Sequence, residues 1–321
     1  MARYVLARLT QAAFVLWAAY TVSFVVLFAL PGDPVALMVG PDANVTEEQM
    51  AAIRSQYGLD RPLAVQYLAG LAEATRGDLG DSMQARQPVT TAIAESFGPT
   101  AKLAGAALVV GTAAGVLLAL LAMLAPRPWQ RTALLTLPPL GVAVPSFLLG
   151  LLLLHLLSFR WQLFPASGDD GWRSLVLPAL TMAAPAAGVI AQVLAAGLRQ
   201  AGREDYMVTA RAKGNSRPRA YARHALRNAA LPALTMTGLL VGGLLAGSVV
   251  VETVFARPGL GRLTTMAVSA QDLALVQGLV LVGAALFVLV NLAVDLLYPL
   301  LDPRVATAPR RRAGVRQITA L

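Results

Sequence analysis

The sequence predicts an all-α protein that crosses a membrane with about six transmembrane helices. Of its 321 residues, 57% are hydrophobic and only 13% are charged, which is more apolar material than a single soluble core can enclose. The apolar residues gather in runs of about 20 or more, the length that a helix needs to cross the hydrocarbon core of a bilayer. The predicted fold class is therefore a polytopic helical membrane protein.

Six apolar runs have the length and low charge of transmembrane helices, and charged residues, glycine or proline bound each of them. They cover residues 9–30, 102–125, 132–157, 174–198, 231–255 and 273–298. The first run is long for the apolar core of a secretory signal and lacks a clear cleavage site of small residues. We therefore expect it to be retained as a transmembrane helix.

Basic residues predict the orientation of these helices. A cytoplasmic N-terminus places 17 of the 26 Lys and Arg residues on the cytoplasmic side, as the positive-inside rule requires. The chain then divides into a first transmembrane helix (1–31), an extracytoplasmic helical segment (32–101), a five-helix membrane core (102–300) with a cytoplasmic connection at 199–231, and a cytoplasmic basic tail (301–321). Both termini are expected in the cytoplasm.

Two short helices are predicted in the extracytoplasmic segment. Thr46 and Gln49 have the spacing of a capping box, which marks a helix start. A second helix is expected to begin with Pro62 in its first position and to end near Gly77. Within the membrane, glycine pairs four residues apart, such as 111 with 115 and 243 with 247, would allow two helices to approach closely.

Several kinds of chemistry are excluded or disfavoured by composition. The chain has no cysteine and two histidines, so we expect no disulfide, no thiolate site and no metal site. It lacks the GxxxxGK[ST] phosphate loop, and we expect it to hydrolyse no ATP by itself. The net charge of +9 is explained by the topology of the connections, and no nucleic-acid partner is expected.

The connection between the fourth and fifth apolar runs, at residues 204–232, has the pattern of a helix, a turn and a second helix. Glu204 and Asp205 favour a helix start, and Lys213 favours a helix end. Gly214 can adopt the left-handed conformation that closes a helix. Ser216 can then cap a second helix, which carries Arg219, Arg223 and Arg227 at intervals of four residues.

The first of these two helices carries a small apolar patch of Tyr206, Met207 and Ala210 among charged neighbours. Such a patch suits a short helix that docks in a groove of another protein. An alternative remains open from the residues alone. The basic side chains could serve only to fix topology, with both helices lying on the inner membrane surface.

A family resemblance rests on this connection and on motifs along the chain. TARAKG, followed by Leu231 and Pro232, resembles the EAA loop of ABC importer permeases, and its peptide-transporter branch is the nearest match. Matching motifs are LPGDPV (30–35), YGLDRPLAVQYL (57–68), GDLGDS (77–82), PSFLLG (145–150), VVVETVFARPGLGR (249–262) and NLAVDLLYPLLDPR (291–304), in order over residues 1–305. Val208 departs from the family pattern, which often has Glu at that position.

The resemblance implies a type I ABC importer permease fold and a non-enzymatic role in the cell inner membrane. In the family the loop is an ATPase-coupling helix, which here comprises Asp205, Tyr206, Met207, Thr209, Ala210, Arg211, Ala212, Lys213 and Gly214. The implied partners are a second homologous permease, two cytoplasmic ATPases that hold ATP and Mg²⁺, an extracytoplasmic binding protein and the lipid bilayer. This chain itself is expected to bind no cofactor.

The implied cargo is a di- or oligopeptide, and glutathione-like compounds or nickel chelates are alternatives within the same family. Two carboxylates in apolar surroundings, Glu252 and Asp295, are hypotheses for the translocation pathway or its gate. A structural role is the alternative, because both lie near helix ends where a side chain can reach water. A proton-coupled secondary transporter that uses these two residues is a further alternative.

Overall fold

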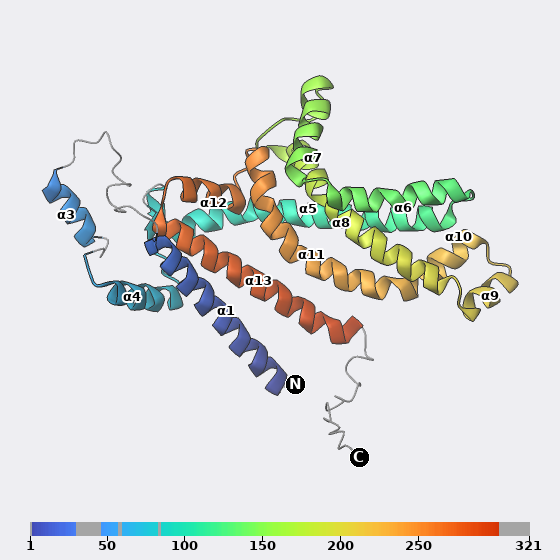
Figure 1. Cartoon of the computed structure of the whole chain (residues 1–321), viewed down its shortest axis with the longest axis horizontal. Helices are drawn as coiled ribbons and strands as arrows, with labels where there is room; N and C mark the ends of the chain where they lie inside the picture. The colour runs from blue at the N-terminus through green and yellow to red at the C-terminus, as the bar shows by residue number, and fades with distance from the viewer. Residues whose placement is uncertain (1, 30–45, 57–59, 83–84, 302–321) are drawn as a thin grey trace, which may run out of the picture.

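The computed structural model describes residues 2–29, 46–56, 60–82 and 85–301, and these are predominantly helical (Figure 1). The helices are α1 (Ala2–Ala29), α3 (Glu47–Gln56), α4 (Leu63–Thr75), α5 (Val89–Leu124), α6 (Pro128–Ala143), α7 (Ser146–Leu153), α8 (Gly171–Ala201), α9 (Asp205–Ala212), α10 (Arg217–Ala220), α11 (Leu226–Val254), α12 (Leu260–Ser269) and α13 (Leu273–Leu301). Two π-helical segments, η1 (Leu154–Arg160) and η2 (Tyr221–Ala225), continue α7 and α10, and β1 (Asp81–Ser82) pairs antiparallel with β2 (Gln87–Pro88).

Among the described residues, five helices are long and apolar enough to cross a membrane: α1, α5, α8, the continuous helix from α10 to α11, and α13. The predicted third span is a bent pair, in which residues 128–143 and 146–160 meet at 105°. The span predicted at 132–157 therefore corresponds to two helical segments with a sharp bend between them. Pro145 causes the break, because it pushes the preceding residue out of the helical region, and Val144 is extended with ψ 123°.

Two helices extend beyond the apolar runs that predict them. Lys102, the first residue of the predicted membrane core, lies inside α5, which begins at Val89 and has 36 residues. The second helix of the 204–232 connection continues without a break into the next span, since α10, η2 and α11 form one helix of 38 residues. An exposed Lys102 and arginines on the solvent side of a helix do not interrupt it, so an apolar run does not mark where its helix begins.

The helices give the bundle two ends (Figure 1). At the α9 end, Arg217 Nη2 at the start of α10 donates a hydrogen bond to Met123 O at the end of α5, over 2.9 Å. At the α12 end, Ser82 Oγ in β1 donates to Asp272 Oδ2, just before α13, over 2.7 Å. The connections predicted to lie on opposite sides of the membrane are thus found at opposite ends of the bundle.

Helix α8 forms the centre of the core, packed between α5, α6 and α11. Small residues allow α5 to approach it closely: a Cβ at Gly111 would lie 2.9 Å from the Cβ of Ala186, and one at Gly115 would lie 2.9 Å from Ala187 O. The close approach predicted for this glycine pair is confirmed. A Cβ at Gly243 or Gly247 of α11 would meet nothing within 4 Å, so that pair brings no two described helices of this chain together.

The two short helices predicted before the core are confirmed as α3 and α4. Thr46 and Gln49 form the capping box, with N–O distances of 3.0 and 3.3 Å between backbone and side chain. Gly77 follows α4 with φ +84°. Pro62 lies one position before the first helical residue rather than in it, which is a small correction to the predicted start.

Candidate functional sites at the two ends of the bundle

The turn after α9 has the hydrogen bonds of a Schellman motif. Gly214 adopts φ +84°, and its N–H donates to Arg211 O over 2.9 Å. The N–H of Asn215 donates to Ala210 O over 3.2 Å, and Asn215 Nδ2 donates to the same oxygen over 3.0 Å. This pattern ends a helix by giving its last carbonyls partners. The predicted left-handed conformation of Gly214 is confirmed.

The apolar side of α9 faces this chain rather than a partner, which corrects the predicted docking patch. Met207 and Ala210 are 3% and 6% exposed and pack in a core cluster with Met123 and Leu198, and Tyr206 packs against the same cluster. The patch is buried because the turns at both ends of α9 fold the helix back onto α5 and α8. An isolated helical pattern cannot distinguish packing against its own chain from packing against another protein.

The opposite side of α9 is exposed and consists of Asp205, Val208, Thr209, Arg211 and Ala212, which we call the α9 outer face. Val208 is 67% exposed. The remaining predicted coupling residues, Lys213 and Gly214, are also exposed. The predicted coupling residues therefore separate into three that hold α9 on the bundle and six available to a partner, to which the structure adds Val208.

Helix α10 continues from the same turn. Ser216 occupies the N-cap position, but its side chain makes no capping hydrogen bond. Arg217 instead fixes the junction, since its guanidinium binds Met123 O and lies 6.0 Å from the centre of the Tyr221 ring. The helix start is thus tied to the end of α5.

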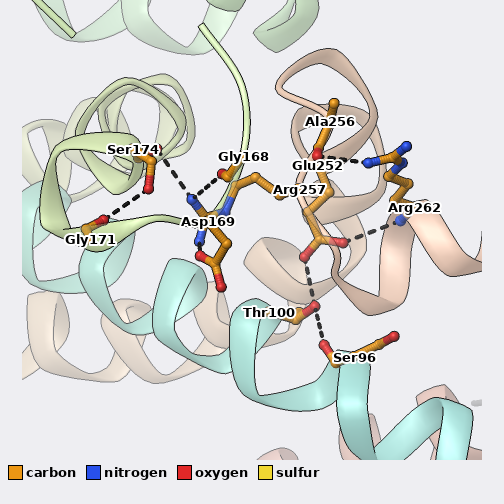
Figure 2. Close-up of polar contacts among 10 residues, drawn as sticks. All are labelled: Ser96, Thr100, Gly168, Asp169, Gly171, Ser174, Glu252, Ala256, Arg257 and Arg262. Carbon is orange, nitrogen blue, oxygen red and sulfur yellow. Dashed lines mark hydrogen bonds and ion pairs between the residues drawn. The ribbon is translucent and has the colours of Figure 1, made fainter. Parts of the chain in front are cut away.

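At the α12 end, the carboxylate of Glu252 caps the start of α12 (Figure 2). Its Oε2 accepts the backbone N–H of Gly261 over 2.7 Å and that of Arg262 over 3.2 Å. Its Oε1 accepts the hydroxyl of Thr100 over 2.6 Å. A helix N-terminus presents unpaired N–H groups and partial positive charge, and a carboxylate satisfies both.

Glycine is required beside this carboxylate. A Cβ at Gly259 would lie 2.3 Å from Glu252 Cδ, and a Cβ at Gly261 would lie 2.3 Å from Val249 Cα. Two atoms that are not covalently bonded to each other cannot approach to either of these distances. The PGLG motif therefore lets the start of α12 fold directly against the end of α11.

Arg257 forms a second buried connection next to Glu252 (Figure 2). It is 1% exposed, and its Nη1 donates to Gly168 O and Ser174 O, each over 3.2 Å. Its Nη2 pairs with the carboxylate of Asp169. A buried guanidinium is tolerated when carbonyls and a carboxylate surround it. Arg257 thus ties the α11–α12 turn to the segment that leads into α8.

The expectation that Glu252 reaches water is wrong, because the residue is 0% exposed and its carboxylate has three protein donors. Its assignment to the translocation pathway stays a prediction. Sequence reasoning missed Thr100, Arg257 and Asp169, although an arginine directly before Pro-Gly was a signal for a special turn. The side chain of Asp295 in α13 lies outside the described residues.

Comparison with protein families identifies the kind of protein to which these two candidate sites belong. Residues 111–307 match the family described as binding-protein-dependent transport system inner membrane component, and residues 1–104 match its N-terminal family. The chain belongs to this family. It is a permease subunit of an ABC importer in the peptide-type group, and it is an inner-membrane transport protein rather than an enzyme.

Curated relatives extend the match over almost the full chain. The glutathione transport system permease protein GsiC of Salmonella choleraesuis (strain SC-B67) is 38% identical over 305 residues, covering 95% of this chain and 99% of the relative. The same permease of Escherichia coli (strain K12) has the same identity and coverage. A crystal structure of an amino acid ABC transporter with histidines has a TM-score of 0.51 at 18% identity, covering 67% of this chain and 94% of that one, and shows the shared fold.

The family membership implies the general assembly of this permease: a partner permease, ATPase subunits and a substrate-binding protein. ATP hydrolysis belongs to the ATPase subunits. The secondary-transporter interpretation of Glu252 and Asp295 loses its basis, because the permease belongs to a family driven by ATP.

Proposed function

We propose that this permease forms half of the translocation pathway for short peptides and peptide-like molecules such as glutathione. The supporting observation is the 38% identity to glutathione permeases over 95% of the chain. Glutathione is itself a tripeptide, so the cargo in the relative's name falls within the peptide class. A second homologous permease would supply the other half, and an extracytoplasmic binding protein would deliver the cargo.

The α9 end is proposed to face the cytoplasm, where the α9 outer face would dock in a groove of one of the two ATPase subunits of the importer. Exposure of Val208, Thr209 and Arg211 beside a buried Met207 supports this assignment. ATP and Mg²⁺ would be held by the ATPases, and this chain would bind no cofactor. Closure of the ATPases on ATP would then move α9, and with it the bundle, largely as a rigid body.

Two aspartate substitutions two residues apart, on opposite sides of α9, test which side of the helix meets the ATPase. Val208→Asp places a charge on the exposed face and is expected to reduce ATPase co-purification, while the permease stays folded. Ala210→Asp places the charge in the buried cluster, where an unpaired carboxylate costs several kcal/mol, and is expected to reduce the yield of folded permease itself. The ATPase-docking proposal fails if Val208→Asp retains full ATPase binding and cargo-stimulated ATP hydrolysis.

Cargo is tested with the complete importer in proteoliposomes, with its binding protein added on the extracytoplasmic side. Uptake of radiolabelled glutathione, a dipeptide, an oligopeptide and a nickel chelate is compared with and without ATP. We expect glutathione or a short peptide to be accumulated and to stimulate ATP hydrolysis. Accumulation of the nickel chelate alone would contradict the peptide assignment while leaving the importer assignment intact.

A further inference from the structure

A cavity of about 270 Å³ lies at the α12 end between α1, α4 and the first turns of α13. Helix α4 is held beside it by contacts with α1: the Tyr20 hydroxyl donates to Tyr67 O over 3.3 Å, and the hydroxyls of Thr21 and Tyr67 lie 2.8 Å apart. A Cβ at Gly70 would lie 2.5 Å from the Tyr20 hydroxyl. The absence of a side chain at Gly70 thus lets α4 pack directly on α1.

The lining of this cavity is amphipathic. Phe24 and Leu281 contribute apolar surface from the two membrane helices. The charged lining residues are Arg61, Glu73, Asp78 and Asp81, three carboxylates against one guanidinium. The cavity therefore favours a ligand with a cationic group, an anionic group next to it, and an apolar part.

Gln277 of α13 adds an amide to the polar part of this lining. Its side chain interacts with the hydroxyl of Tyr20 in α1, which also lines the cavity. An amide N–H can also donate a hydrogen bond to an ester or phosphate oxygen of a bound molecule.

The surfaces around the cavity favour a lipid molecule as its ligand. Val22, Val25 and Val26 of the membrane helix α1 are 54–62% exposed, and lipid covers the surface of such a helix. Helix α4, packed on α1, exposes Leu63 and Leu68 at 55% and 63%. An amphipathic helix next to a transmembrane helix can lie in the headgroup layer with these side chains in the acyl region.

We propose that the cavity binds the headgroup of a phospholipid that carries both a phosphate and a primary ammonium group. Arg61 contacts the phosphate, and Glu73, Asp78 and Asp81 surround the ammonium group. One acyl chain leaves the cavity along Phe24 and Leu281. The excess of carboxylates disfavours headgroups that carry only negative charge. The proposal does not depend on the cargo or on which side of the membrane the α12 end occupies.

The experiment measures lipid retained by the assembled importer. The complex is reconstituted in nanodiscs with equal phosphatidylethanolamine and phosphatidylglycerol, transferred to detergent and analysed by native mass spectrometry. We expect one phosphatidylethanolamine bound per copy of this permease, with at least about tenfold preference over phosphatidylglycerol, equivalent to about 1.4 kcal/mol.

Matched variants locate the bound lipid. Ala69→Trp fills the cavity that Ala69 lines, and it is expected to abolish retention. Ala64→Trp, at an exposed position of the same helix, is expected to leave retention unchanged. The pair Glu73→Gln with Asp81→Asn is expected to abolish the preference for phosphatidylethanolamine, whereas Glu47→Gln with Glu48→Gln, which removes equal charge from α3, preserves it.

Three results would overturn the proposal. The first is equal retention of phosphatidylglycerol and phosphatidylethanolamine by the wild-type complex. The second is unchanged lipid preference in the Glu73→Gln, Asp81→Asn variant, which also decides the matter if Ala69→Trp does not fold. The third is displacement of the lipid by a free dipeptide, which would make the cavity a subsite for solute. Cargo uptake measured in parallel separates each of these results from a failure of the importer assignment.

Discussion

The Glu252 carboxylate accepts the Thr100 hydroxyl over 2.6 Å, and the same hydroxyl oxygen accepts the backbone N–H of Leu260 over 2.8 Å. This pair joins α5, α11 and the start of α12 at one buried point. Helix α12 is only ten residues long, so its position depends on how its first turn is held. The two residues therefore fix the geometry of the α12 end.

Glu252→Gln is expected to loosen α12 without disrupting assembly with the partner permease. A neutral amide accepts backbone N–H groups more weakly than a carboxylate, and hydrogen bonds to charged groups contribute about 1.5–3 kcal/mol. Amides at the start of α12 should then exchange about tenfold faster in hydrogen–deuterium exchange. Glu95→Gln, at an exposed position of α5, is the control. Identical exchange in the two variants would contradict the capping role of Glu252.

Gly261→Ala is expected to displace α12 or prevent folding of the α12 end, because the added Cβ would lie 2.3 Å from Val249 Cα. Gly247→Ala adds the same methyl group to α11 where nothing lies within 4 Å, and it should be neutral or stabilise by up to about 1 kcal/mol. Thermal unfolding of the purified permease in detergent measures both. Equal midpoints for the two variants would show that close packing at Gly261 is unimportant.

Gly214→Val is expected to uncouple ATP hydrolysis from transport. The residue has φ +84°, where a β-branched side chain costs about 1–3 kcal/mol, and the turn that orients α9 would shift. Nothing lies within 4 Å of a Cβ at this position, so backbone conformation alone is tested. Gly214→Asn is the matched control, because asparagine tolerates the left-handed region.

The measurements for the Gly214 variants are ATPase co-purification and cargo-stimulated ATP hydrolysis. Gly214→Asn should retain both, and the membrane helices should remain folded in each variant because their packing does not involve this turn. Full coupling in Gly214→Val would remove the proposed role of the turn.

Single cysteines test the orientation cleanly, because the chain has no cysteine of its own. Thr75 and Lys213 are exposed at opposite ends of the bundle. In intact cells, Thr75→Cys should react with a membrane-impermeant maleimide, and Lys213→Cys should react only after permeabilisation. Equal labelling of both in intact cells would reject the N-in, C-in topology.

Hydropathy predicted the membrane helices well. The lipid core excludes unpaired polar and charged groups, so each span appears in the sequence as a long apolar run. Hydropathy could not predict the break at Pro145 with certainty, since a proline within an apolar run can kink a helix or divide it in two. It also missed the 36-residue length of α5, because helical structure continues into the polar layer where hydropathy gives no signal.

The candidate sites were predicted less completely than the fold. The left-handed Gly214 was predictable because the conformation follows from local residue type. The burial of Met207 and the partners of Glu252 depend on contacts between residues far apart in sequence, such as Thr100, 152 positions away. Periodicity along a helix carries no information about which neighbour covers its apolar face.

The continuous helix from Arg217 to Val254 has 38 residues, a length of about 57 Å at about 1.5 Å per residue. It carries the junction with α9 at one tip and the capping carboxylate of Glu252 near the other. Tilting such a rod by about 5° about its midpoint displaces each tip by about 2.5 Å in opposite directions, by the same rise per residue. A small push on one face of the membrane thus becomes an opposite displacement on the other, as a lever pivoted in the bilayer would produce.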